Sequence, residues 1–245
     1  MALAADALPG IPEVRPGDDL AALIAAAAGG DLRSGDVLVV AHKVVSKAEG
    51  ALADLRTVTP SARARELAEP FGKDPRHVQV VLDESAEIVR AERGVIIART
   101  RHGLVCANAG VDASNAPDDE TLVLLPRDPD ASARRLRGAL PGHPAVVIAD
   151  SFGRAWRHGQ CDVAIGIAGL APLEDWRGRP DARGRSLHAT WIALADEAAA
   201  AADLARAKDS REPVVVVRGL ERFVTDAEGP GAAALLRPPA EDLFR

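Results

Sequence analysis

The chain of 245 residues is poor in aromatic side chains, with no tyrosine, three tryptophans and four phenylalanines. So few rings argue against a stacking platform for single-stranded nucleic acid. The formal net charge of -6 likewise gives no general attraction for nucleic acid. An anionic ligand would therefore have to be held by local clusters of lysine and arginine, or by a metal ion.

Cysteine is also scarce. Cys106 and Cys161 are the only two cysteines, and they lie far apart in no zinc-binding spacing. This usage predicts a reduced, cytoplasmic chain with two small buried thiols. The N-terminal segment lacks the positive charge and the long apolar core of a secretion signal. The Ala-rich run Ala21–Ala28 is too short to span a membrane, so no membrane partner is expected.

Apolar strands alternate with helical patterns, which predicts a mixed α/β fold. The expected strands are Asp36–Val45, Thr121–Leu125, Val146–Ile148 and Val214–Val217, with a hairpin of Gly94–Ala98 and Gly103–Ala107. The expected helices are Asp19–Ala28, Pro60–Phe71, Asp130–Leu140 and Ser186–Lys208, while His77–Leu82 and Glu87–Arg93 are ambiguous between helix and strand. Loops are expected at Leu8–Val14, Leu170–Arg185 and the tail Glu228–Arg245. No repeat or clear linker divides the chain, so we expect one domain over residues 1–245, in which two lobes could pack closely.

The stretch Ala145–Gly169 combines an apolar strand with a cluster of polar groups. The apolar run Val146–Ile148 leads into Asp150 and Ser151, and Arg154 and Arg157 follow. An acidic residue and a hydroxyl at a strand end are suited to a divalent cation, and arginines are suited to anionic oxygens. An equally open alternative is that Asp150 caps the next segment and that the arginines are solvated.

Three polar loops are expected after three apolar strands: Lys43–Gly50, Asn108–Asn115 and Asp150–Arg157. Ligand sites in α/β proteins gather where strands end and loops begin. If the three loops meet, Asp112 and Asp150 could share a cation, and Lys47 could face phosphate together with the two arginines. Asn115 could then contact a base or a ribose.

Familiar catalytic signatures are absent. The sequence contains no GxxxxGK[ST], no GxGxxG and no kinase signature, so any nucleotide site must be of a less common kind. Ser151, His158 and Asp162 could in principle form a hydrolase triad. Their crowding into twelve residues and the lack of a nucleophile elbow argue against it.

Six motifs together resemble those of one enzyme family. They are GIPEVRPGDDL, VVSKAEG, AGVDASN, ADSFGRAWRHGQCDVAIGIAGL, ADEAAAAADL and RPPAEDLFR, in this order from Leu8 to Arg245. The chain thereby resembles the coenzyme F420-0:L-glutamate ligase (gamma-glutamyl ligase) family, in the stand-alone form that lacks a fused flavin-binding domain. The resemblance implies mixed sheets with flanking helices and an intertwined homodimer.

The resemblance also implies a reaction. Members join the amine of L-glutamate to the phospholactyl carboxylate of coenzyme F420-0, using GTP and releasing GDP and phosphate, and can add further glutamates through gamma linkages. The expected cofactors are Mg²⁺ or Mn²⁺, with K⁺ as a further ion. The alternative is a divergent paralogue that binds nucleotide or deazaflavin without this chemistry, or that ligates a different acid and amine.

Roles follow from the resemblance position by position. The nucleotide-binding positions are Ile11, Pro12, Glu13, Val14, His42, Lys47, Asn115, Gly184, Arg185, Ser186, Leu187, His188, Ala189 and Thr190. The metal ligands are Asp112, Asp150 and Ser151, the last of these at a second cation. The expected catalytic residues are Asp112 and Asp150, together with Arg154 and Arg157, which the polar cluster of the stretch Ala145–Gly169 suggests.

The sequence departs from the family pattern at two positions of the predicted site. His42 stands where a small hydroxyl residue usually touches the nucleotide, and Trp191 stands where a carboxylate or amide usually ligates the second cation. Tryptophan cannot ligate a hard cation. The second cation is therefore either held by other groups, such as Asp162 or Glu197, or lost.

Overall fold

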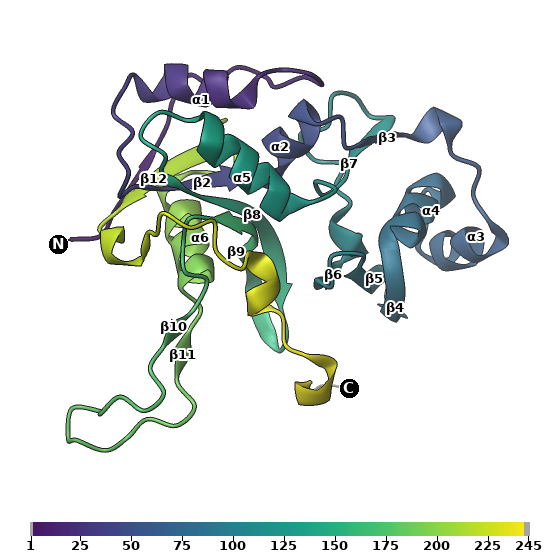
Figure 1. The fold of residues 1–245 in the computed structure, drawn as a ribbon. Coiled ribbons are helices and arrows are strands. Elements are labelled where there is room, and N and C mark those ends of the chain that lie inside the picture. Colours follow the sequence, from purple (N-terminus) through teal and green to yellow (C-terminus); the bar gives the residue numbers. More distant parts are fainter. Residues whose placement is uncertain (1, 243–245) are drawn as a thin grey trace.

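A five-stranded mixed sheet forms the centre of the computed structural model, which describes residues 2–242. The strand order is β1-β12-β2-β8-β9, in which β2 and β8 are parallel and the other neighbours are antiparallel. The strands are β1 (Ala4–Ala7), β2 (Val37–Ala41), β8 (Ala145–Arg154), β9 (Arg157–Ala168) and β12 (Val214–Arg218). Figure 1 shows helices above and below this sheet.

Helices cover both faces of the sheet because its central strands are apolar on both sides. The four residues Val37–Val40 are completely buried, which is the pattern of a strand covered on both faces. Helices α1 (Leu20–Ala28) and α5 (Pro129–Ala139) pack on one face, and α6 (Leu194–Ala205) packs on the other. Each face has its own apolar cluster, so the body is a three-layer α/β/α arrangement.

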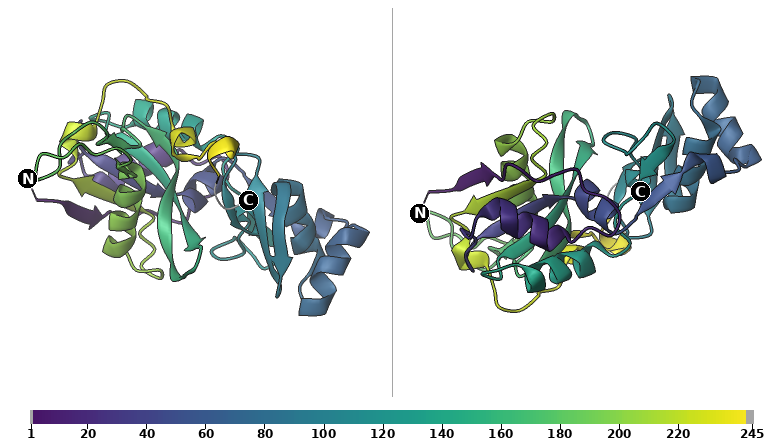
Figure 2. Two further views of the ribbon diagram at one scale, coloured as in Figure 1. Left: turned by 90° about the horizontal axis from the view of Figure 1, so that it is seen from below. Right: turned by 90° about the horizontal axis from the view of Figure 1, so that it is seen from above.

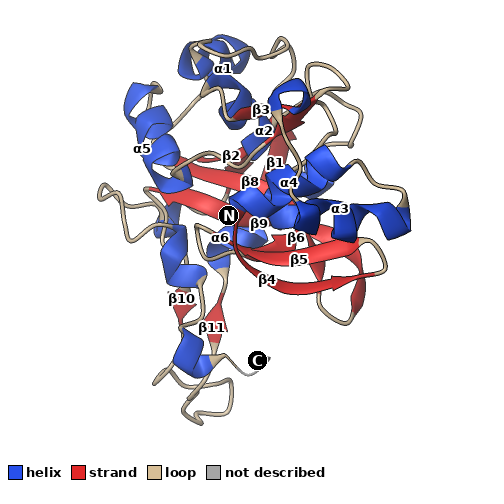
Figure 3. Cartoon of the chain, turned by 90° about the vertical axis from the view of Figure 1, so that its right-hand side faces the viewer, coloured by secondary structure: helices blue, strands red, loops and turns tan. Residues whose placement is uncertain are grey.

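A smaller lobe extends from one end of the sheet (Figure 2). It contains a three-stranded sheet of β4 (Ser85–Glu92), β5 (Val95–Thr100) and β6 (Val105–Ala107). Helices α3 (Ala62–Ala68) and α4 (Pro75–Glu84) lie beside these strands in Figure 3 and bury Val78, Val81 and Ile96 in a third apolar cluster. The short strands β3 (Leu52–Asp54) and β7 (Thr121–Val123) pair where the chain enters and leaves this lobe.

A narrow arm leaves the body between β9 and α6. Its base is the two-residue ladder of β10 (Glu174–Asp175) and β11 (Trp191–Ile192), and the connecting loop extends away from the sheet in Figure 1. Helix α2 (His42–Ala48) follows β2 directly, and 3₁₀ turns lie at Leu55–Thr57, Glu69–Phe71, Asn108–Gly110, Glu221–Phe223, Ala232–Leu235 and Pro239–Glu241. Within residues 2–242, no helix has the length and apolar character needed to cross a lipid bilayer.

Most expected elements are confirmed with shifted ends. Helices α1 and α5, strands β7 and β12, and the hairpin of β5 and β6 lie where the sequence predicts them. The ambiguous segments His77–Leu82 and Glu87–Arg93 belong to helix α4 and mainly to strand β4. The predicted tail is a loop with a short Ala-Leu turn as far as it is described, and its last residues, 243–245, lie outside the described part.

Three expectations are wrong. The strand expected over Asp36–Val45 ends at Ala41, and helix α2 (His42–Ala48) follows at once in place of a loop. The loop expected over Asp150–Arg157 is instead the end of the β8–β9 hairpin, because Asp150 to Arg154 stay paired with β9. The long helix expected over Ser186–Lys208 is only α6, because residues 186–190 belong to the arm and Trp191–Ile192 is a strand.

A tight approach between β9 and α5 generates a prediction for stability. A Cβ at Gly166 would lie 2.5 Å from the backbone of Pro129, whereas a Cβ at Gly138 on the exposed side of α5 would meet nothing within 4 Å. We expect Gly166→Ala to lower the free energy of unfolding by about 1–3 kcal/mol through overpacking. Gly138→Ala should raise it by about 0.5–1 kcal/mol through helix propensity.

Urea unfolding of the two variants beside the unchanged chain is the measurement. Both changes add the same methyl group to the same pair of elements, so each controls for the other. Equal midpoints for the two variants would contradict the packing described for α5 and β9.

Candidate functional site

Helix α2 begins next to Asp150. The helix follows β2 without a loop, and Ala41 at the end of β2 pairs with Ala149 on β8. His42 Nε2 therefore lies 3.2 Å from Asp150 Oδ1. The His42 ring is 2% exposed, and its Nδ1 lies 3.4 Å from Ser46 Oγ. Nε2 makes no hydrogen bond of standard geometry within the described chain, so the Asp150 carboxylate is the polar group that it faces.

Asp112 reaches the same turn of α2 from the loop that follows β6. Lys43 Nζ lies 2.7 Å from Asp112 Oδ2, and the amide of Ser114 donates to Asp112 Oδ1 at 2.7 Å. Burial raises the pKa of Asp112, but the hydrogen bonds from Lys43 and Ser114 outweigh it and hold the pKa below its ordinary value. Lys43 also donates to Ser114 Oγ, and the exposed Asn115 follows in a left-handed conformation with φ of 57°. Asn115 is thus held near Asp112.

Asp112 and Asp150 are therefore held by consecutive residues of one helix turn, Lys43 and His42. Within residues 2–242, no three His, Cys, Asp or Glu side chains gather into a group that could hold a metal ion. Mg²⁺ is commonly bound by one or two carboxylates together with substrate phosphates and water, so two carboxylates at one turn suit it. That these two residues share one cation stays a prediction.

Cys106 on β6 lies in the electrostatic range of Asp150. Burial, and to a smaller extent the negative charge of Asp150, raises the pKa of the Cys106 thiol to about 12. The thiol is therefore protonated at neutral pH and is not a nucleophile. Both cysteines are free, as expected, but Cys161 is only half-buried, because it lies on the part of β9 that extends beyond the sheet.

The segment Ile11–Val14 meets α2 at Lys47. The Lys47 side chain is 5% exposed, and its ammonium pairs with the exposed carboxylate of Glu13. Ile11 and Val14 are buried in the core beneath, while Pro12 and Glu13 face outward. Two predicted nucleotide-binding motifs that are distant in sequence are thus in contact.

Ser151 points to the opposite face of β8 from Asp150, because successive side chains of a strand alternate. It pairs with Asp162 on β9, and its hydroxyl donates to Asp162 Oδ1 at 2.5 Å. Arg206 Nη2 lies 2.5 Å from the other oxygen, Oδ2, of this carboxylate, which is 1% exposed. Lys208 Nζ donates to Ser151 Oγ at 3.0 Å.

The hairpin end does not form a hydrolase triad. Ser151 bonds to Asp162 directly, with no histidine between them, as the crowding of these residues in the sequence suggested. Arg154 Nη2 donates to the backbone oxygen of His158 at 2.6 Å, so this guanidinium braces the hairpin. Arg157 is exposed at the start of β9. The catalytic roles of the two arginines stay predictions.

The predicted segment Gly184–Thr190 lies in the arm, and Figure 1 shows this arm extending away from the sheet and from α2. Its backbone closes on the other side of the arm, with Leu187 N bonded to Arg179 O at 2.9 Å and Trp176 N bonded to Thr190 O at 3.0 Å. Six of its seven residues are exposed, and Leu187 is half-buried. Within one chain, the structure does not bring this segment to Lys47 or Asp150.

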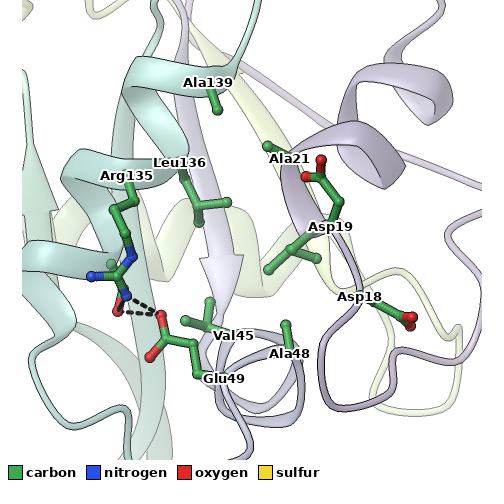
Figure 4. Close-up of a pocket in the computed structure, with 11 residues that line it drawn as sticks. Asp18, Asp19, Ala21, Val45, Ala48, Glu49, Arg135, Leu136 and Ala139 are labelled. Atoms are coloured by element: carbon green, nitrogen blue, oxygen red, sulfur yellow. Dashed lines mark hydrogen bonds and ion pairs between the residues drawn. The ribbon is translucent and has the colours of Figure 1, made fainter.

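Two small pockets lie away from Asp112 and Asp150. One of about 230 Å³ lies between α1, α2 and α5, where Arg135 Nη2 is 2.5 Å from Glu49 Oε1 (Figure 4). The other, of about 240 Å³, is lined by residues that include His102, Ile165 and Leu236. Neither pocket is lined by Asp112 or Asp150.

Sequence reasoning missed three cationic residues of this region. Lys43 directly precedes the VVSKAEG motif, and its position after a buried strand was a usable signal. Arg206 and Lys208 gave no signal, because they come more than forty residues after Ser151 and Asp162 and meet them only through the packing of α6 on β9.

Known proteins match the chain over most of its length. The family model described as F420-0:Gamma-glutamyl ligase matches residues 10–219. The coenzyme F420:L-glutamate ligase of Methanopyrus kandleri is 50% identical over 239 residues, covering 95% of this chain and 94% of that protein. The protein of the same name from Methanothermobacter thermautotrophicus is 46% identical over 244 residues, covering 96% of each chain. The one from Methanocaldococcus jannaschii is 42% identical over 219 residues, covering 87% and 86%.

The resemblance that the six motifs predict is thereby confirmed over nearly the whole chain. With the family model covering its central 210 residues and relatives at up to 50% identity spanning its length, the chain belongs to the F420-0:gamma-glutamyl ligase family.

Proposed function

We propose that this chain is a coenzyme F420:L-glutamate ligase, which uses GTP to join L-glutamate to the carboxylate of coenzyme F420-0 and can add further glutamates through gamma linkages. Family membership and relatives of that name support the reaction. The structural observation that carries the proposal is the turn of α2 at which Asp112 and Asp150 meet Lys43 and His42. Carboxylates and cations in this arrangement suit a triphosphate with a divalent cation.

The reaction requires the carboxylate to be activated. An oxygen of the F420-0 carboxylate attacks the γ-phosphorus of GTP, and the bond to the β-phosphate oxygen breaks, which gives an acyl phosphate and GDP. The amine of glutamate then attacks the acyl carbon, loses a proton, and phosphate leaves with the bonding electrons. Holding the reactants in line can contribute on the order of 7–11 kcal/mol to lowering the barrier.

The residues fit a divalent cation of the Mg²⁺ or Mn²⁺ type. Asp112 and Asp150 would hold it through their carboxylates, and phosphate oxygens and water would complete the set. When bound, the ion would neutralise charge that develops on the phosphates. Because Asp112 keeps a lowered pKa, it is ionised and ready to bind a cation at neutral pH.

Lys43 and Lys47 are poised to exchange partners when a triphosphate arrives. Each ammonium is paired with a carboxylate, Lys43 with Asp112 and Lys47 with the exposed Glu13. A phosphate can replace each carboxylate as the partner of its lysine, which frees Asp112 for the cation that comes with the nucleotide. The exchange keeps the local charge balanced at every stage, which lowers the cost of assembling so many charges.

His42 serves this site through Asp150. Its ring is 2% exposed, which keeps it from the direct nucleotide contact that its sequence position predicts, and its Nε2 faces Asp150 Oδ1. A residue so fixed holds the carboxylate in one orientation, as outer partners of metal ligands commonly do.

The arm belongs, in this proposal, to a homodimer in which each chain supplies Gly184–Thr190 to the GTP site of its partner. Within one chain the arm extends away from α2, and a projecting exposed loop of this kind is suited to reach a second copy. Arg183 and Arg185 would bring positive charge to the triphosphate, and their own amides are already turned inward onto Asp181 Oδ1 at 2.8 Å.

One prediction concerns Asp150. Asp150→Asn removes a charged ligand but no core volume, so turnover should fall at least about 100-fold. The measurement is the release of GDP and the mass of the glutamylated product after incubation with GTP, glutamate, Mg²⁺ or Mn²⁺ and coenzyme F420-0. The unfolding midpoint should be unchanged. Asp119→Asn, at an exposed carboxylate beyond the Asp112 loop, is the control and should keep full activity.

Full turnover by Asp150→Asn would refute the assignment of Asp150. GTP binding without product in the unchanged chain would favour the divergent paralogue instead.

A second prediction tests the arm. Asp150→Asn and a variant with residues 183–189 replaced by a short glycine-serine turn should each be inactive alone. When equal amounts of the two variants are mixed and the dimers are allowed to reassemble, half of the dimers are hybrids. One of the two sites in each hybrid then has both an intact Asp150 and an intact arm. Roughly a quarter of the original activity should therefore return, as two-fold symmetry requires. No recovery in a verified hybrid would show that the arm acts within its own chain.

A further inference from the structure

The two positions that the family resemblance assigns to a second cation are poorly suited to hold it in this chain. One of them is Trp191 on the arm. Its indole Nε1 donates to Asp175 Oδ1 at 2.9 Å, and the guanidinium of Arg177 lies over its ring at 4.1 Å. An indole has no lone pair in its plane to give to a metal, and here its only polar atom already has a partner. Trp191 thus stiffens the base of the arm and binds no ion.

The other position is Ser151, whose hydroxyl already has two charged partners. It donates to Asp162 Oδ1 and accepts from Lys208 Nζ, at 2.5 and 3.0 Å. It also faces the α6 side of the sheet, while Asp150 faces α2. A cation held by Asp112 and Asp150 therefore does not gain Ser151 Oγ as a further ligand.

The charges around Ser151 oppose a divalent ion. Asp162 is the carboxylate in contact with this hydroxyl, and it is 1% exposed and bonded to Arg206. Lys208 Nζ lies 3.8 Å from Asp162 Oδ1 and 2.8 Å from Asp203 Oδ1. A divalent ion at Ser151 would have to displace the ammonium and approach the guanidinium of Arg206, and both positive charges repel it.

We propose that this chain holds one divalent cation, at Asp112 and Asp150, and that the ammonium of Lys208 supplies at Ser151 the positive charge that a second cation would supply. The inference rests on the proposed function. The Lys208 side chain is 69% exposed, so its ammonium, which has three donors, can contact a phosphate oxygen while it stays beside Ser151, whereas Arg206, at 11%, stays on Asp162.

The open edge of β8 lets one ligand reach both Asp150 and Lys208. Strand β2 ends at Ala41 opposite Ala149, so beyond that point β8 is paired with β9 alone. A triphosphate lying along this edge can contact the α2 face at Asp150 and the α6 face at Lys208. In the reaction, one metal ion and the ammonium of Lys208 would then together neutralise the charge on the phosphates.

Metal stoichiometry is the direct test. Mn²⁺ binding, followed by electron paramagnetic resonance with saturating guanosine 5′-(β,γ-imido)triphosphate, should give one ion per chain, and Asp150→Asn should abolish it. Two ions per chain with turnover intact would overturn the inference and leave the proposed function standing. No bound ion, together with no GDP release, would overturn both.

Variants of Lys208 give the second readout. Lys208→Met should lower kcat at least about tenfold at saturating Mg²⁺, because it removes a charge that acts on the transferring phosphate, while the Mn²⁺ count stays at one. Lys208→Arg should recover most of the loss. Arg211→Gln removes one charge from an exposed position in the same connection and should leave kcat unchanged. An unchanged kcat in Lys208→Met, or a failure of Lys208→Arg to recover, would refute the role of the ammonium.

Discussion

The parallel register of β2 and β8 determines where the site lies. Ala41 pairs with Ala149, and since α2 begins immediately after β2, its first residue is placed beside the next residue of β8, which is Asp150. The 3.2 Å approach of His42 to Asp150 is thus a consequence of how two strands pair. These strands are fixed by completely buried valines on both faces, each of which stabilises the fold by about 1.5–3 kcal/mol. The charged site is held in place by the apolar sheet beneath it.

A second constraint is the alternation of side chains along β8. Asp150 and Ser151 are consecutive, yet they belong to different charge clusters on different faces of the strand. On the α2 face Asp112 is paired with the partly exposed Lys43, which a substrate can replace, while the buried His42 holds Asp150. On the α6 face Asp162 has a buried partner, Arg206, and burial makes that pair costly to break. Each face thus combines one buried pair, His42 with Asp150 or Arg206 with Asp162, with an ammonium that is more exposed, Lys43 or Lys208.

The sequence predicted the sheet and its helices better than the segments near the site. Periodicity and caps located α1, where Asp19 accepts from the amide of Ala22, and α5, which begins at Pro129. The prediction from sequence failed at α2, because Val44 and Val45 extend an apolar run that is typical of a strand, whereas the chain forms a helix from His42 onward. It failed again at Ser186–Lys208, where the Ala-rich pattern hides a two-residue strand at Trp191. In both places tertiary packing decided between structures of similar local preference.

The sequence motifs predict site residues, whereas they give no sign of the partners that these residues have in the structure. Asp112 and Lys43 are 69 residues apart and Ser151 and Lys208 are 57 apart, so no spacing rule connects them. The partners of Trp191 were likewise not predictable, because the sequence indicates only that a metal ligand is missing at this position. In the structure its indole, with Asp175 and Arg177, supports a ladder of two residue pairs that is too short to be stable alone. Trp191 thus adds rigidity to the arm, and in our proposal the ammonium of Lys208 supplies beside Ser151 the positive charge that a second cation would bring.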